Sequence, residues 1–514
     1  MSRRLRLAPW VVAALGAAAY LVLAPDSADL AAQEYRAALV RRDGPGIWNN
    51  GWYAGHHTPA YSVLSPPLGA LLGVRLAGAL AAVAAAALFA RLARHHWAPG
   101  PATAAAVWFA LATVATLLTG RLTFLLGTAV ALGALLALAE RRHALAAPLA
   151  AAAALASPVA GLFAALAAVA YGLATPARRG AAALVAAAAL APALLLAALF
   201  PEGGSEPFVA SAFWPALAAI ALVAALLPAR ERALRIGAGL YALGCVAAFA
   251  ISTPLGGNVT RLGALVAGPI VLGALGSRRH PALLAAVALP LAYWQAYPAV
   301  RDVARAAGDP AVEAAYHEPL LRFLQRAPRD GPFRVEIPPT ENLWEAAHVA
   351  PRTPLARGWQ RQLDRRYGAL FYDGSLTAAS YRAWLDEHAV AYVALPDAEL
   401  DGAARAEAAL VARGLPYLRP VWRGEHWRVF AVRAAAPLVQ GSARATISLS
   451  ADGFELTARQ PGSALVRVRH SRWWRVTAGR ACVGPGAGGM TSVRVAARGT
   501  VRVQARLTGA RCRA

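Results

Sequence analysis

Long apolar runs constrain this chain more than any other feature of its sequence. Eleven runs rich in Ala, Leu and Val lie before residue 297, and the pattern then stops. A bilayer crossing requires about 20 mostly apolar residues in a helix, because lipid offers the backbone no hydrogen-bond partners. The sequence therefore predicts a mainly α, polytopic transmembrane bundle over residues 1–296. The runs lie at 8–24, 67–90, 102–119, 122–139, 144–156, 159–174, 181–200, 212–228, 236–252, 262–276 and 281–296.

Arginines occur in alternate gaps between these runs. If each run crosses once, all of these gaps fall on one side, which the positive-inside rule assigns to the cytoplasm. We therefore expect a cytoplasmic N-terminus and an extracytoplasmic region after residue 296, in a multi-pass plasma-membrane protein. The arginines are Arg3, Arg4, Arg6, Arg91, Arg94, Arg141, Arg142, Arg178, Arg179, Arg230, Arg232, Arg235, Arg278 and Arg279.

Two of the runs leave alternatives open. Only Ser157 and Pro158 separate runs 144–156 and 159–174, which form either two short crossings or a re-entrant pair with the same sidedness. The first run is either a signal peptide or an anchor. We favour a retained anchor, because the apolar run is long and Pro25 follows the best small-residue site.

The chain carries a net charge of +24, which invites a nucleic-acid interpretation. Every one of its 51 basic residues is Arg, many lie between apolar runs, and no nucleic-acid-binding motif occurs. Membrane orientation and a coding bias against Lys account for the charge better. No nucleic-acid partner is expected.

The remainder of the chain predicts two soluble parts outside the membrane. Residues 297–438 combine helices at 310–327, 375–390 and 401–413 with strands at 333–337 and 391–396 and a closing hairpin, as in a small α/β domain. Residues 439–514 alternate apolar and polar residues, as in a small β-sandwich. Neither part contains a P-loop or a G-x-S-x-G elbow.

This topology predicts the chemical state of the cysteines. Cys482 and Cys512 fall in the β-rich part, on the oxidising side of the membrane, and are predicted to form a disulfide. Cys245 lies inside an apolar run, where a small core residue is expected.

The first outer loop, residues 25–66, is the only long one within the membrane domain, and long loops are usually functional or disordered. Residues 28–42 predict an amphipathic surface helix, with Asp26, Asp29 and Glu34 near its start. The stretch "WNNGWYAGHHTPAYSVLSPPLG" follows at residues 48–69. Its aromatic residues fit either an interfacial belt or a surface that stacks on sugar rings. His56 and His57 have no partner at metal-ligand spacing.

Acidic residues after the first run, a juxtamembrane helix and "GWYAGHHTPAYSVLSPPLG" before the second run resemble the glycosyltransferase C-fold membrane superfamily, and more closely its multi-spanning actinobacterial members. "LASPVAGLF", "IPPTENLWEAAHVAP" and "ARGWQRQLDRRYGALFY" are similar as well. The resemblance implies sugar transfer from a polyprenyl-phosphate donor to a cell-envelope glycan or glycolipid on the extracytoplasmic face.

The resemblance also implies residue roles. An acid of the first outer loop acts as general base, and Asp29 matches best, with Asp26 and Glu34 as substitutes. The adjacent Asp-Glu pair of some members is missing, so no cofactor is expected, although a divalent metal stays open. Arg121 and Arg261, with Arg75 as a third candidate, suit a departing phosphate. The expected sugar- and acceptor-binding residues are Trp52, Tyr53, His56, His57 and Tyr61.

Two other classes of function compete. A transporter or flippase usually carries polar groups near the bilayer midplane and internal repeats, whereas these runs are nearly pure Ala, Leu and Val with no repeat. A non-catalytic scaffold with the same fold also fits, because fold alone does not imply function.

The arginine alternation generates a testable topology. A reporter that folds only in the cytoplasm, fused after Ala514, should be inactive, because that end is expected outside. The same reporter placed after Arg142 should be active. Activity of the Ala514 fusion would reverse the assigned orientation.

Overall fold

The computed structural model describes residues 8–276, 281–327 and 331–513. The chain separates into two compact units. Unit 1 comprises Met1–Gln33 and Ala60–Ala307, and unit 2 comprises Glu34–Pro59 and Gly308–Ala514. This division differs from the boundary expected at residue 296, because the last helix of unit 1 continues to Ala306 and most of the first outer loop belongs to unit 2.

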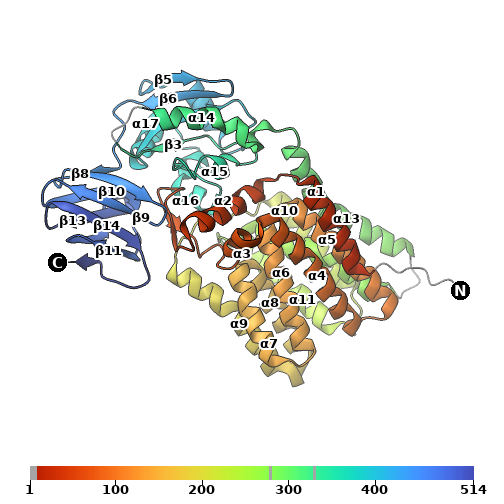
Figure 1. The fold of residues 1–514 in the computed structure, drawn as a ribbon. Coiled ribbons are helices and arrows are strands. Elements are labelled where there is room, and N and C mark those ends of the chain that lie inside the picture. Colours follow the sequence, from red (N-terminus) through yellow and green to blue (C-terminus); the bar gives the residue numbers. More distant parts are fainter. Residues whose placement is uncertain (1–7, 277–280, 328–330, 514) are drawn as a thin grey trace. The chain divides into compact units, whose positions relative to one another are not determined.

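Unit 1 is a bundle of helices (Figure 1). Ten of the eleven expected runs contain one helix each, and the run at 67–90 contains two, the short helix α3 and then α4 after a break at Gly73. The helices are α1 (Pro9–Leu23), the first part of α2 (Ala28–Asp43), α3 (Ser65–Leu72), α4 (Val74–His96), α5 (Pro99–Leu118), α6 (Leu122–Ala139), α7 (His143–Ala156), α8 (Pro158–Ala174), α9 (Arg179–Leu199), α10 (Ala210–Leu226), α11 (Arg232–Ala250), α12 (Arg261–Leu275) and α13 (Pro281–Ala306).

Six helices within the described residues are long and apolar enough to cross a membrane, or seven if the bent pair of α1 and α2 counts as one span. The two helices of that pair meet at 78°. Helices α7 and α8 have 14 and 17 residues and are separated by Ser157, whose hydroxyl accepts a bond from the backbone N–H of Ala160. The mainly helical, multi-spanning fold class is therefore confirmed.

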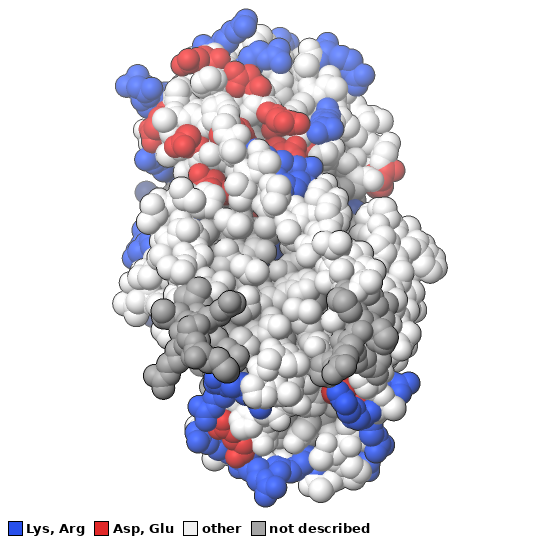
Figure 2. All heavy atoms as spheres, turned by 90° about the vertical axis from the view of Figure 1, so that its right-hand side faces the viewer, with Lys and Arg blue, Asp and Glu red and all other residues white. Residues whose placement is uncertain are grey.

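The packing of unit 1 is that of a membrane bundle. Buried side chains between α6, α7, α8 and α9 are mostly alanines, such as Ala134, Ala150 and Ala168. Large apolar side chains, including Leu194 and Leu289, point outward instead. Small residues allow close helix contact in lipid, where burial of apolar surface gives no driving force. Figure 2 shows a broad uncharged surface on this unit, with charged side chains gathered at the lower end of the bundle.

Several arginine-rich turns meet at one end of the bundle. Glu140, which follows α6, accepts from Arg91 of α4 at 2.7 Å and contacts Arg142 at 3.3 Å. His96, the last residue of α4, lies 2.7 Å from Glu231, which precedes α11. The turns after α4, α6 and α10 therefore share one end, as the alternation predicts. Arg3, Arg4, Arg6, Arg278 and Arg279 lie outside the described residues.

The first part of unit 2 is built around a four-stranded sheet of order β3-β4-β6-β5, in which β3 is parallel to β4 and the other pairs are antiparallel. The expected helices and strands are present with shifted ends. The elements are α14 (Ala314–Arg326), β3 (Arg334–Glu336), α15 (Glu345–His348), α16 (Arg361–Tyr367), α17 (Ala378–Glu387), β4 (Val390–Pro396), α18 (Arg405–Ala412), β5 (Leu418–Arg423) and β6 (Trp427–Val432).

The second part of unit 2 consists of two antiparallel sheets with the orders β15-β12-β13-β10-β7 and β11-β14-β9-β8 (Figure 1). Alternate residues such as Val466, Val493 and Val503 are fully buried in one shared core. The strands are β7 (Val439–Gln440), β8 (Ala445–Ser450), β9 (Gly453–Ala458), β10 (Gly462–Arg469), β11 (Trp474–Ala478), β12 (Ala481–Pro485), β13 (Met490–Val495), β14 (Gly499–Ala505) and β15 (Cys512–Arg513).

The outer loop joins the two parts of unit 2 through β1 (Trp48–Asn49) and β2 (His56–His57). Trp48 belongs to the core of the β part. Arg469 of β10 donates from Nε to the Tyr53 carbonyl at 2.7 Å and from Nη2 to His388 at 2.8 Å. Its guanidinium also lies 3.5 Å from the centre of the Tyr367 ring. One arginine therefore connects the loop, the α/β part and the β part.

Candidate functional site

Asp29 lies in the first turn of α2 and pairs with Arg121, which precedes α6. The Nε atom of Arg121 donates to Oδ2 of Asp29 at 3.1 Å. Both side chains are about a quarter exposed, so the pair is partly screened by solvent and open to a ligand.

Arg75, near the start of α4, forms a second pair at this end of unit 1. It donates to Oδ1 of Asp26 and to the Pro25 carbonyl, both at 2.7 Å. Arg75 thus holds the Asp26 carboxylate and the preceding carbonyl, whereas Arg121 donates one bond to Asp29. The bond from Arg121 to Asp29 is longer, at 3.1 Å, than the bond from Arg75 to Asp26, at 2.7 Å.

Arg261 completes a cluster of three residues that we call the Asp29 cluster: Asp29, Arg121 and Arg261. Electrostatic interactions link Arg261 with Arg121 and Asp29, and also with Tyr61 and Glu206. Within the described residues, the Nε atom of Arg261 is buried without a hydrogen-bond partner. The structure therefore brings the two predicted phosphate-binding arginines together with the predicted base.

Gln33 and Gly120, which the sequence analysis did not single out, position this cluster. Gln33 accepts at 2.9 Å from both the backbone N–H and the hydroxyl of Thr123, and its amide donates to the Gly120 carbonyl. Gly120 has φ +71°, and a Cβ there would collide with Ser27 and the backbone of Leu30. These contacts fix α2 against the turn between α5 and α6. In the sequence, the only indication of this turn was the pair Thr119-Gly120 before Arg121.

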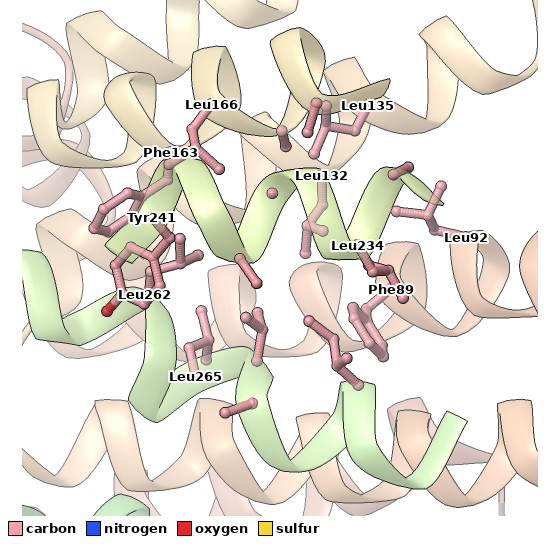
Figure 3. A pocket seen from close by; sticks show the side chains of 18 of the residues that line it. Phe89, Leu92, Leu132, Leu135, Phe163, Leu166, Leu234, Tyr241, Leu262 and Leu265 are labelled. Carbon is pink, nitrogen blue, oxygen red and sulfur yellow. The ribbon is translucent and has the colours of Figure 1, made fainter. Parts of the chain in front are cut away.

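A cavity of about 550 Å³ lies inside unit 1 (Figure 3). Its labelled side chains, including Leu132, Phe163 and Leu234, point into it from several helices. Phe124 and Leu138 of α6 both line it. They lie 14 positions apart in the helix, so the cavity extends over about 20 Å along α6. The guanidinium of Arg261 lies 5.7 Å from the centre of the Phe124 ring, so the Asp29 cluster adjoins one end of the cavity.

Four of the five expected sugar- and acceptor-binding residues lie in unit 2. Trp52, Tyr53, His56 and His57 belong to unit 2 and are buried. Trp52 stacks on Tyr35 at 4.3 Å and donates to the Ala346 carbonyl at 3.2 Å. Protein groups of unit 2 enclose these four side chains. Tyr61 lies in unit 1, in electrostatic contact with Arg261.

The third candidate base, Glu34, belongs to unit 2 and is half-buried. Glu34 and Asp29 both lie in α2, but Asp29 belongs to unit 1. The interactions of Arg121 and Arg261 described above involve Asp29.

Unit 2 holds a separate buried charge network. Arg357 donates to both carboxylate oxygens of Asp364 and to Glu407, and Tyr381 donates to Glu407 at 2.8 Å. Burial raises the pKa of Glu407, and the Arg357 guanidinium opposes that rise. These side chains bond mainly to one another and are enclosed, which indicates a structural role.

No group of three or more His, Cys, Asp or Glu side chains within the described ranges is arranged to hold a metal ion.

No protein-family model matches the chain, and no curated protein matches it. Among solved structures, the chain is similar to ArnT from Cupriavidus metallidurans in the apo state. That similarity has a TM-score of 0.39 and 15% sequence identity, and it covers 82% of this chain and 97% of the other.

Proposed function

We propose that this protein transfers a sugar from a polyprenyl-phosphate donor to a cell-envelope acceptor on the extracytoplasmic face of the plasma membrane. One observation carries the proposal: a carboxylate and two guanidinium groups adjoin an apolar cavity inside the bundle. A lipid-linked phosphate needs both features, a cationic site for its head and an apolar site for its chain.

Arg261 and Arg121 are assigned to the phosphate. The buried Nε atom of Arg261 has no hydrogen-bond partner among the described residues, which is costly, and a phosphate oxygen would satisfy it with a charge-assisted bond. The same two groups would stabilise the negative charge that develops when the phosphate leaves the sugar.

The cavity is assigned to the hydrocarbon chain. Its lining is dominated by Ala, Leu, Val and aromatic side chains over about 20 Å of α6. A polar solute would leave its hydrogen-bonding groups without partners there, so this lining favours a lipid ligand over transport of a polar solute.

Asp29 is assigned the proton transfer. When phosphate attracts Arg121, the Asp29 carboxylate loses its partner and can accept the proton of the acceptor hydroxyl. The acceptor oxygen then bonds to the anomeric carbon, the bond from that carbon to the phosphate oxygen breaks, and polyprenyl phosphate leaves. Every atom of this step comes from the two substrates and Asp29.

The Asp29→Asn variant should lose transfer activity by about a hundredfold or more, because Asn keeps the shape but cannot accept the proton. The assay uses radiolabelled polyprenyl-phosphate sugars with a lipid extract as acceptor source. Asp43→Asn, at the other end of α2, is the matched control and should retain activity. Near-normal transfer by a folded Asp29→Asn protein, with loss in Glu34→Gln or Asp26→Asn, would reject this assignment.

Arg261→Gln should raise KM for the lipid donor by about tenfold or more, since one charge-assisted bond contributes about 1.5–3 kcal/mol. Arg94→Gln, an exposed arginine near the end of α4, should leave KM unchanged. Equal KM values for the two variants would contradict the phosphate site.

A further inference from the structure

The β part of unit 2 is strongly basic. Residues 439–514 contain thirteen arginines but only two carboxylate side chains, Asp452 and Glu455. Both carboxylates already pair with arginines, Glu455 with Arg502 and Asp452 with Arg506, each at 2.7 Å. The other arginines of this part therefore have no carboxylate of the same part left to neutralise them.

Three of these arginines converge on one place. The Arg472 carbonyl accepts from Nη1 of Arg475 at 2.8 Å and from Nη2 of Arg511 at 3.0 Å. Two guanidinium groups that share one oxygen lie close together, and their like charges repel. Arg475 is only 9% exposed, and its Nε has no hydrogen-bond partner among the described residues.

An indole ring adjoins the same cluster. The guanidinium carbon of Arg472 lies 5.0 Å from the centre of the half-buried Trp473 ring, and that of Arg475 lies 5.8 Å from it. An aromatic face beside clustered cations suits a ligand that has both a ring and an anionic group.

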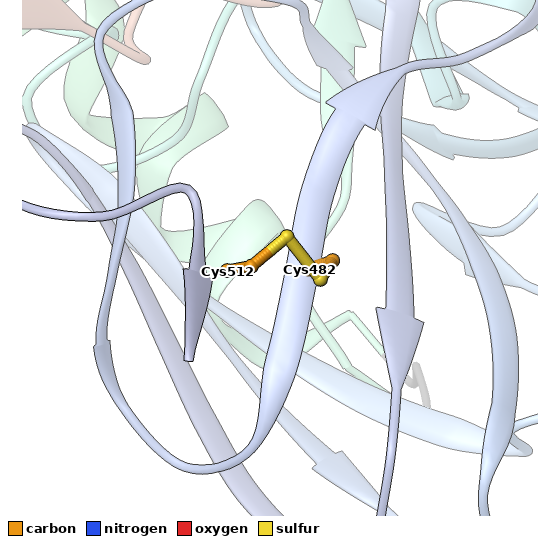
Figure 4. Close-up of a disulfide and its surroundings, with 2 residues drawn as sticks. All are labelled: Cys482 and Cys512. Carbon is orange, nitrogen blue, oxygen red and sulfur yellow. A yellow bond between two sulfur atoms is a disulfide. The ribbon is translucent and has the colours of Figure 1, made fainter. Parts of the chain in front are cut away.

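The disulfide fixes the third arginine. Cys482 and Cys512 are bonded, and they lie opposite each other where β12 pairs with β15 (Figure 4). The neighbouring carbonyls of Ala510 and Arg511 accept from Val476 of β11 at 3.0 Å and from Val483 of β12 at 2.9 Å. The terminal segment thus bonds to a strand of each sheet and holds Arg511 beside Arg475.

Electrostatics support the convergence. Burial lowers the pKa of Arg475, and the nearby Arg511 charge lowers it further. Burial and the Arg511 charge also lower the pKa of His470. A bound anion would relieve this repulsion.

We propose that Arg472, Trp473, Arg475 and Arg511 bind an anionic saccharide, with a phosphate or carboxylate group on the guanidinium cluster and a sugar ring on the indole. A disulfide is typical of oxidising compartments, where envelope glycans occur and nucleic acid is not the ordinary ligand. The proposed saccharide site lies in unit 2, and binding there does not depend on the transfer activity proposed above.

The test is calorimetric titration of the full chain in detergent with four probes: glucose 1-phosphate, oligogalacturonate, maltotetraose and oligothymidylate. The two anionic saccharides should bind, the neutral one should not, and added NaCl should weaken binding. Binding of only one anionic saccharide identifies whether phosphate or carboxylate is the group recognised.

Arg511→Gln should lower the affinity for the bound saccharide by about tenfold or more, the value of one charge-assisted bond. Trp473→Leu should also weaken the saccharide but have less effect on inorganic phosphate. Arg459→Gln, an exposed arginine that follows β9, removes the same charge and should change nothing.

Three results would overturn the proposal: equal affinity of the Arg511→Gln and Arg459→Gln proteins, equal binding of maltotetraose, or tighter binding of oligothymidylate. Because Arg511 is exposed, its substitution is expected to leave the fold intact, and mass measurement of the disulfide checks this.

Discussion

The exclusion of charge from the interior of the bundle governs the organisation of unit 1. Its helices are almost free of ionisable side chains between their ends, so the charged residues gather at the two ends of the bundle. One end collects Arg91, Glu140 and Glu231, and the other collects Asp29, Arg121 and Arg261. The second end carries the proposed chemistry, because Arg261 lies beside Phe124, which lines the cavity between the alanine-rich helices.

Helix α2 gives this end its geometry. Its first residues belong to unit 1, where Gln33 fixes the helix against the turn at Gly120, and its later residues belong to unit 2, where Tyr35 stacks on Trp52. A helix that is anchored by hydrogen bonds rather than by apolar packing alone can present a carboxylate at a defined position. The Asp29 and Arg121 pair is therefore a consequence of backbone contacts in the turn as much as of charge.

The sequence predicted the helices and strands better than the contacts between them. Each of the eleven apolar runs is helical, and arginine alternation places the turns after α4 and α6 at one end, because bilayer physics acts on each run separately. The meeting of Arg121, Arg261 and Asp29 followed from the same sidedness. The roles of Gln33 and Gly120 could not be predicted, since they depend on how closely two distant segments approach.

The loop aromatics show the other limit of sequence reasoning. Trp52 and His56 fit a sugar platform and a packed core equally well, because the same flat side chains serve both. Only tertiary contacts distinguish the two, and here Arg469, Ala346 and Tyr35 enclose the loop within unit 2. In the β part, the excess of arginine was visible in the sequence, whereas the convergence of Arg475 and Arg511 depends on the terminal strand.

The proposed sugar transfer depends most on where a lipid phosphate binds. A cryo-electron microscopy structure of the protein with polyprenyl phosphate measures this directly. The account predicts phosphate density within hydrogen-bond distance of Arg121 and Arg261, the hydrocarbon chain in the cavity beside Phe124, and a broken contact between Arg121 and Asp29. Phosphate density at the opposite end, beside Arg91 and Arg142, with an empty cavity would contradict it.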